Sequence, residues 1–227
     1  MPVLKQHLIS AENDELIKLI LTCYGNISAL NSKTRDIYIL NQRVVVPAII
    51  STLQRSQLGS TLMQRAAWCI SKFFETPATD SLKNHSGTLI SALLETLGRA
   101  EQVNCLTSES MEATVSYILL SLTRFSTTKR RGGVPADRLD FLLKEKDDLV
   151  VTLTFLAEKS ESYDRVTVRA IQLMSNFVWQ SKGHYLDKMI EAGFLGLLPA
   201  ELLDHGCKGV RSEAVAFIHR LLTECPE

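Results

Sequence analysis

The feature that most constrains this chain is a pattern of apolar residues that recurs along it. One copy runs Val166, Ala170, Leu173, Met174 and Phe177, with steps of four, three, one and three residues. These steps place the side chains on one face of an α-helix, because a helix has about 3.6 residues per turn. The same pattern starts at residues 16, 62, 111, 166 and 210. We therefore predict five long helices that each bury one face.

The segments beside the last two copies predict what lies between long helices. LDKMIEAG predicts a short helix closed by Gly193, because glycine adopts the left-handed C-cap conformation at little cost. FLGLLPAELLDHG predicts a medium helix, and GVRSEAVAFIHRLL predicts the next long one, with Ser212 and Glu213 in its first turn. The β-branched run at 44–46 is too short to favour strands over this pattern. The predicted fold class is all-α.

This order of short, medium and long helices resembles an armadillo repeat of the importin-alpha kind. The long-helix starts are 46, 49, 55 and 44 residues apart, and armadillo and related repeats have periods of about 40 to 47 residues. The resemblance implies one domain over residues 1–227, folded as a right-handed superhelical armadillo- or HEAT-type solenoid of about four to five repeats. Such a solenoid presents an extended concave surface. We expect the first repeat to be incomplete, with its long helix and part of another in LKQHLIS, so that it would be either a cap or a truncated repeat.

Turns and insertions follow from the same comparison of repeats. The turn between short and medium helix is expected near Arg43, Gly87, Asp147 and Gly193, because apolar runs follow each of them. The long third interval predicts a loop insertion at 125–138, FSTTKRRGGVPADR, which is rich in turn-forming residues. The second interval also has a few residues more than the repeat period, and we expect them in GRAEQVNCLTSES.

Composition and charge exclude several classes of partner. Apolar residues are 45% and charged residues 22%, as in ordinary folded proteins, and the basic and acidic residues balance at 25 each. No net charge favours nucleic acid or an anionic membrane. No apolar run approaches the roughly 18 residues of a membrane span, and the first residues lack the pattern of a signal peptide. We expect a protein or peptide partner, no small-molecule substrate, and a location in the cytosol or nucleus.

Signals for catalysis, cofactors and metals are missing from the sequence. It contains no GxSxG, HExxH, P-loop or GxGxxG motif, and its histidines lack the spacing of metal ligands. We therefore predict a protein that is not an enzyme and that uses no cofactor or metal. The cysteines form no CxxC pair, and Cys23 and Cys69 fall on apolar helical faces. We interpret them as free thiols in a reducing compartment.

Two positions on each long helix lie beside the buried face. They are six and ten residues beyond the first apolar position, roughly 120° from the middle of that face. In chain order the pairs are Thr22 and Asn26, Trp68 and Lys72, Tyr117 and Ser121, Gln172 and Asn176, and Ala216 and Arg220.

In the importin-alpha family, a tryptophan followed four residues later by an asparagine on the third helix of a repeat holds an extended peptide. The asparagine amide bonds the peptide backbone, and tryptophan faces flank the stems of lysine and arginine. The resemblance carries this role to Trp68, Asn26 and Asn176, although none of these repeats has both residues. Lys72 and Arg220 stand where asparagine would, and a cation there repels a basic cargo.

We predict a peptide-binding face from these residues. An amide can donate and accept together, as a peptide backbone requires, and aromatic rings offer flat amphipathic surfaces. The alternative is that they are ordinary exposed or half-buried helix residues. The predicted site consists of Thr22, Asn26, Trp68, Lys72, Tyr117, Ser121, Gln172, Asn176 and Trp179.

The tripeptide Lys129-Arg130-Arg131 in the predicted insertion has three interpretations. It could occupy the groove as a basic segment of the chain itself, as in importin-alpha proteins, or serve as a localisation signal for another carrier. It could also be a solvated basic loop, as short charge runs usually are. This sequence shows no basic helix of the importin-beta-binding kind before the repeats, so either that segment lies outside the sequence or the protein does not use that carrier.

Together these features predict an importin-alpha-like adaptor that holds an extended peptide or a helix of a partner on the concave long-helix surface, with a role in nuclear transport. One alternative is an armadillo- or HEAT-type structural component of a cytoskeletal or chaperone complex, which would use a loop or the convex face. A second alternative is a helical regulator of an enzyme.

Overall fold

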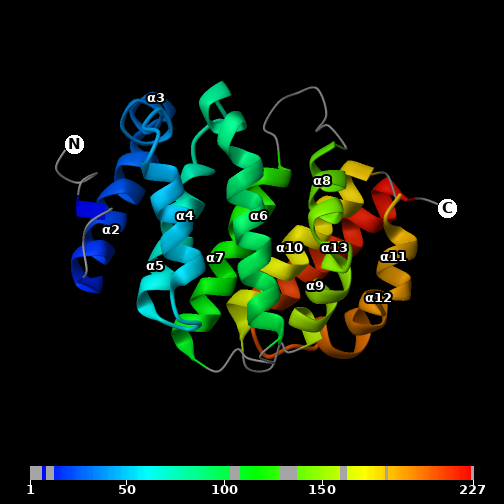
Figure 1. Ribbon diagram of the computed structural model, residues 1–227. Coiled ribbons are helices and arrows are strands. Elements are labelled where there is room, and N and C mark those ends of the chain that lie inside the picture. The colour runs from blue at the N-terminus through cyan, green and yellow to red at the C-terminus, as the bar shows by residue number, and fades with distance from the viewer. Residues whose placement is uncertain are drawn as a thin grey trace. The chain divides into compact units, whose positions relative to one another are not determined.

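The fold is built from helices, as a computed structural model shows (Figure 1). The structure describes residues 7–8, 13–102, 108–127, 137–158, 163–181 and 184–225, and no strand occurs among them. The five predicted long helices are confirmed. They are α2 (Asp14–Leu30), α5 (Thr61–Phe73), α7 (Glu109–Ser126), α10 (Asp164–Ser181) and α13 (Lys208–Glu224). Within the described segments, no helix has both the length and the apolar character needed to cross a membrane.

The other helices connect the long ones. In the first half of the chain they are α3 (Ser32–Arg35), the π-helix η1 (Asp36–Leu40), α4 (Val45–Arg55) and α6 (Asp80–Gln102). In the second half they are α8 (Asp137–Glu145), α9 (Leu149–Glu158), α11 (Leu186–Glu191), α12 (Phe194–Leu197) and the π-helix η3 (Leu198–Leu202).

The contacts divide the chain into two compact units, which we call unit 1 (residues 1–121) and unit 2 (residues 122–227). The boundary falls inside α7. The prediction of a single domain over residues 1–227 is not tested by this division and stays a prediction.

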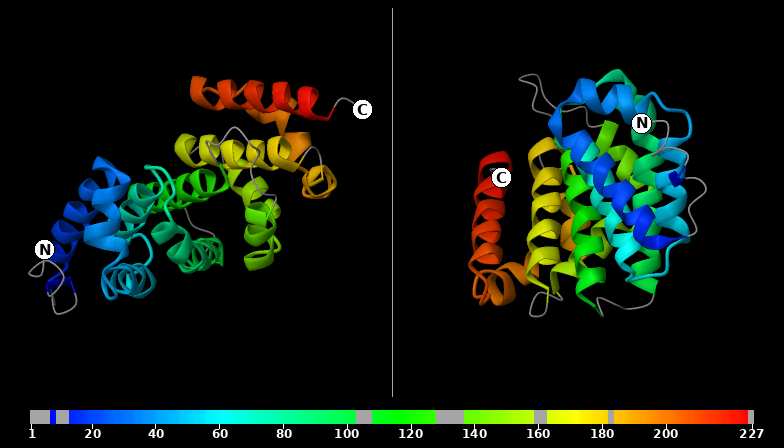
Figure 2. Two further views of the ribbon diagram at one scale, coloured as in Figure 1. Left: turned by 90° about the horizontal axis from the view of Figure 1, so that it is seen from above. Right: turned by 90° about the vertical axis from the view of Figure 1, so that its left-hand side faces the viewer.

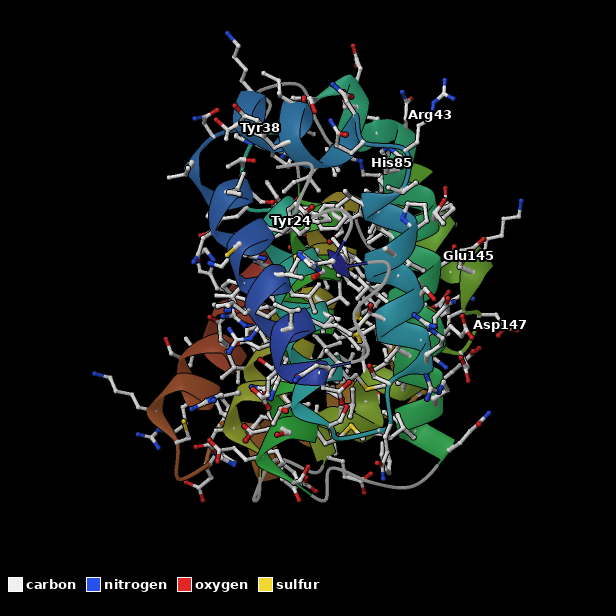
Figure 3. The ribbon with its side chains drawn as sticks, turned by 60° about the vertical axis from the view of Figure 1, so that its left-hand side comes forward. Tyr24, Tyr38, Arg43, His85, Glu145 and Asp147 are labelled. Atoms are coloured by element: carbon white, nitrogen blue, oxygen red, sulfur yellow. The ribbon has the colours of Figure 1, made fainter. Side chains whose placement is uncertain are left out.

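In unit 1, α2 packs against α5, and α4 packs against α5 and α6. Tyr24 of α2 is 1% exposed and lies among the helices, whereas Tyr38 and Arg43 lie at one end of the unit (Figure 3). Side-chain caps set the helix starts: the Asn13 oxygen accepts from the Glu15 amide at 2.8 Å, and the Ser60 hydroxyl accepts from the Met63 amide at 3.2 Å. These caps start α2 and α5 at the ends that their apolar patterns require.

A fully buried arginine fastens the C-terminal end of α5. Arg35 Nη1 donates to the Phe73 carbonyl at 2.8 Å and to Thr76 Oγ1 at 2.6 Å, and Nη2 donates to Thr79 Oγ1 at 2.9 Å. Nη2 also contacts the Asp36 carboxylate at 3.0 Å. Burial lowers the pKa of Arg35, and the Asp36 partner acts in the opposite direction. The network joins α3 to the segment that follows α5.

In unit 2, α10 packs against α9 and α13, and α10 and α13 lie side by side (Figure 2). Edge-to-face ring pairs fill the core, with 5.4 Å between the Phe177 and Tyr185 centroids and 5.1 Å between those of Phe194 and Phe217. Gly193 has a φ of +79° and separates α11 from α12, which confirms its predicted role at that turn.

The predicted turns are correct at three places and wrong at one. The chain turns at residues 41–44 and at 147–148, near Arg43 and Asp147. Gly87 instead lies inside the continuous helix α6. A helix interior tolerates one glycine at a cost of about 1 kcal/mol. The N-terminal half of α6 is also held by His85, whose Nε2 lies 2.8 Å from the Leu40 carbonyl oxygen.

Several predicted features lie outside the described residues. They include most of the insertion at 125–138, with Lys129, Arg130 and Arg131, and residues 103–107 of the segment GRAEQVNCLTSES, with Cys105.

Candidate binding surface of the long helices

The nine predicted binding residues differ in exposure. Asn26 is exposed, and Trp179 is 44% exposed. Thr22, Trp68, Lys72, Tyr117 and Gln172 are half-buried, whereas Ser121 and Asn176 are 0% and 4% exposed. Those in unit 1 are Thr22, Asn26, Trp68, Lys72, Tyr117 and Ser121, and those in unit 2 are Gln172, Asn176 and Trp179.

Trp68 of α5 packs directly on the backbone of α2. A Cβ atom added at Gly25 would lie 2.3 Å from Trp68 Cζ3 and 2.7 Å from its Cη2, so no larger residue fits without movement of the ring. This contact fixes the position of the indole, because the helix backbone beneath it is rigid. Asn26 is the next residue on α2 after Gly25, and it is exposed.

Two cations from the same helix stand over the Trp68 ring. Arg65 Cζ lies 5.1 Å from the ring centroid, and Lys72 Nζ lies 5.8 Å from it. Both distances are within the range of cation–π attraction, which is about 6 Å. Lys72 also forms an ion pair with Glu75 at 2.6 Å, whereas Arg65 has no ion pair with any residue in the described segments. We call Gly25, Asn26, Arg65, Trp68 and Lys72 the Trp68 cluster.

The remaining candidates of unit 1 differ in what they present. The Asn26 side chain makes no hydrogen bond to the residues that the structure describes, so its amide is open to a ligand. Thr22 Oγ1 donates to the Lys18 carbonyl at 2.8 Å. Ser121 Oγ donates to the Tyr117 carbonyl at 2.8 Å, and this hydroxyl is buried rather than presented. Tyr117 itself is half-buried.

In unit 2, Asn176 is engaged inside the protein. Its Nδ2 donates to the Thr123 carbonyl at 3.2 Å, and to Ser126 Oγ and Thr127 Oγ1 at 2.9 Å each. Since an amide nitrogen has two protons, this donor is saturated by the end of α7. Asn176 therefore connects α10 to α7 rather than facing solvent.

Gln172 is held between two charged residues. Its Oε1 accepts from Arg169 Nη1 at 2.6 Å, and its Nε2 donates to Glu213 Oε1 at 2.7 Å. The second bond joins α10 to α13, so both ends of this amide are also occupied. Trp179 is the most exposed candidate of unit 2, and the Arg220 guanidinium stands 5.9 Å from its ring centroid.

Sequence reasoning missed Gly25, Arg65 and Glu213, which complete these arrangements. Arg65 lies three residues before Trp68, a spacing that places both on one helical face, so this signal was present in the sequence. Gly25 and Glu213 contact residues about 40 positions away, and no local pattern identifies such partners.

Cys69 and Tyr24, on the helices of this surface, have core environments. Burial raises the pKa of the Cys69 thiol, and the nearby Arg65 offsets only part of this shift. Burial also raises the pKa of Tyr24. The described cysteines, Cys23, Cys69, Cys207 and Cys225, are free. Across the described segments, no group of three or more His, Cys, Asp or Glu side chains could hold a metal ion.

Comparison with known proteins defines the fold. No family model and no curated protein matches the chain. Among solved structures, the chain is similar to a designed armadillo repeat protein in complex with the peptide (KR)4. The TM-score is 0.69 at 16% sequence identity, over 96% of this chain and 80% of that chain. The chain therefore has an armadillo-like repeat fold, which confirms the predicted fold class. Its likeness to importin-alpha in particular stays a prediction.

Proposed function

We propose that this chain is a non-enzymatic protein-binding scaffold that holds an extended peptide segment of a partner on its long helices. The face of α2 and α5 in unit 1 is the proposed binding site. The narrower form of the proposal is an importin-alpha-like adaptor that acts in nuclear transport, with the cytosol or nucleus as its place of action.

The exposed Asn26 amide, one residue along α2 from the Gly25 that contacts the Trp68 ring, carries the proposal. An extended peptide leaves its backbone N–H and C=O groups unpaired, and one side-chain amide can satisfy one of each. The indole supplies a rigid apolar surface at small entropic cost, because Gly25 and Arg65 already fix its position. The designed armadillo protein, which was solved with a peptide, supports the same use of the fold.

An array of extended peptides with basic, acidic and apolar sequences, screened against the intact chain, tests this function. A peptide that binds is then titrated against Asn26→Ala, with Asn84→Ala as the matched control. Asn84 is an exposed asparagine on α6, and its side chain makes no hydrogen bond within the described segments. We expect Asn26→Ala to weaken binding about fivefold to tenfold, the equivalent of roughly 1 kcal/mol for one hydrogen bond. Equal affinities of the two variants would contradict the proposed site.

The second candidate is a structural or regulatory subunit of a cytoskeletal, chaperone or enzyme complex. The engaged amides of unit 2 favour it, because Gln172 and Asn176 stabilise helix contacts rather than present groups to a peptide. Under this alternative, no member of the array would bind the face of α2 and α5. Partner capture by the intact chain would then be unchanged in a variant that combines Asn26→Ala with Trp68→Leu.

A further inference from the structure

The Trp68 cluster differs from a site that grips basic side chains. In such a site, bare tryptophan faces flank the stems of lysine or arginine supplied by the peptide. Here Arg65 and Lys72 already lie 5.1 Å and 5.8 Å from the Trp68 ring centroid, and the ring packs against α2 at Gly25. A third cation would have to displace one of these residues and would be repelled by both.

We propose that the Trp68 cluster binds an acidic extended peptide, with an Asp or Glu side chain of the partner on the Arg65 guanidinium. This inference rests on the proposed function, because it names the class of peptide for the same surface. The peptide backbone would bond the Asn26 amide, and the anionic side chain would lie over α5.

The environment of Arg65 supports a carboxylate ligand. A guanidinium that lies over an aromatic ring can keep N–H groups free for a ligand, and these groups match the two oxygens of a carboxylate. Arg65 has no carboxylate partner in the described parts of the chain, whereas Lys72 is paired with Glu75. The ring also limits the rotation of the arginine, so less side-chain entropy is lost on binding.

The net charge around the Trp68 ring also favours an anionic ligand. Arg65 and Lys72 contribute two positive charges and Glu75 one negative charge, so these three residues leave one positive charge uncompensated. The whole chain is neutral, with 25 basic and 25 acidic residues, so the attraction is local. It is therefore effective over roughly one Debye length, about 8 Å at physiological salt.

Three peptides of equal length test the inference by fluorescence anisotropy with the intact chain: (Asp-Glu)4, (Lys-Arg)4 and (Ser-Gln)4. We expect (Asp-Glu)4 to bind at least tenfold more tightly than (Lys-Arg)4, and its affinity to fall as salt rises. Arg65→Gln should weaken (Asp-Glu)4 about tenfold or more, the usual scale for a hydrogen bond to a charged group. Arg43→Gln is the matched control, since Arg43 is exposed at the end of unit 1 (Figure 3).

The outcomes separate this inference from the proposed function. Tighter binding of (Lys-Arg)4 than of (Asp-Glu)4 overturns the inference but is consistent with the proposed function as a peptide-binding scaffold. Equal losses for Arg65→Gln and Arg43→Gln also overturn it, because the acidic peptide would then bind elsewhere. If neither these peptides nor any other extended sequence binds, both ideas fail. Arg65→Lys is a conservative second variant, because it keeps the positive charge but lacks the planar guanidinium. An affinity for (Asp-Glu)4 between those of the wild type and Arg65→Gln supports the inference. Wild-type affinity of Arg65→Lys opposes it.

Discussion

The long-helix faces of the two units use equivalent positions in opposite ways. In unit 1, the Asn26 amide is exposed, and the cationic side chains of Arg65 and Lys72 lie over the Trp68 ring. In unit 2, the Nδ2 atom of Asn176 donates to three oxygens at the end of α7, and Gln172 is bonded to Glu213 of α13. The same repeat position therefore joins helices in one unit and is available for recognition in the other. An asparagine at this position does not by itself indicate a ligand contact.

The largest expected effect concerns the arginine that supports the face of unit 1. Arg35→Ala removes a fully buried guanidinium and leaves the Asp36 carboxylate and the Phe73 carbonyl without that donor. We expect a loss of about 3 to 5 kcal/mol of stability, the usual cost of breaking a buried charged network. Hydrogen exchange should show the loss in α2 and α5. The exposed Arg43→Ala should change stability by no more than about 0.5 kcal/mol, and equal effects of the two variants would remove Arg35 from this role.

The two asparagines test the comparison directly. Asn176→Ala removes a buried amide that donates to three oxygens at the end of α7, and we expect urea denaturation to show a loss of about 2 kcal/mol. Asn26→Ala should change stability by less than about 0.5 kcal/mol, because this side chain is exposed. Peptide affinity should fall more in Asn26→Ala than in Asn176→Ala. Similar stability losses in the two variants would mean that the units do not differ in this way.

Two glycine-to-alanine substitutions test whether the α2 backbone holds the Trp68 ring in place. Gly25→Ala places a Cβ atom 2.3 Å from Trp68 Cζ3, and such overpacking costs about 1 to 3 kcal/mol. Gly98→Ala is the matched control in helix α6, because nothing lies within 4 Å of its added Cβ. We expect this control to be neutral or stabilising by up to about 1 kcal/mol. In a Trp179→Phe background, tryptophan fluorescence should change for Gly25→Ala and not for Gly98→Ala.

The smallest expected effect concerns the exposed tryptophan of unit 2. A double-mutant cycle of Arg220→Gln and Trp179→Leu should give a coupling energy of about 0.5 to 1 kcal/mol, the usual scale of an exposed cation–π pair. The corresponding cycle of Arg65→Gln and Trp68→Leu should give a larger value, because the Trp68 ring is less exposed. A larger coupling in unit 2 would reverse the proposed difference between the two tryptophans.

Local patterns predicted the helices well and failed where distant residues intervene. The five long helices follow from apolar spacing, and Gly193 follows from the need for a positive φ at a turn. Gly87 was expected at a similar turn, but His85 and buried Leu82 hold the N-terminal half of α6 in line with the rest. Asn176 was correctly placed on a long helix, whereas its partners Ser126 and Thr127 lie about 50 residues earlier in the chain.

The amino-acid sequence alone determined that this protein is made of amphipathic helices in a repeating order, because periodicity and capping act within a few turns of one helix. Only the tertiary structure decided which polar residues remain open. That outcome depends on which groups a neighbouring helix brings within hydrogen-bond distance. The apolar pattern of a single helix does not predict those groups. Asn26 and Asn176 occupy the same position in their repeats, and their different neighbours leave the first exposed and the second buried and hydrogen-bonded.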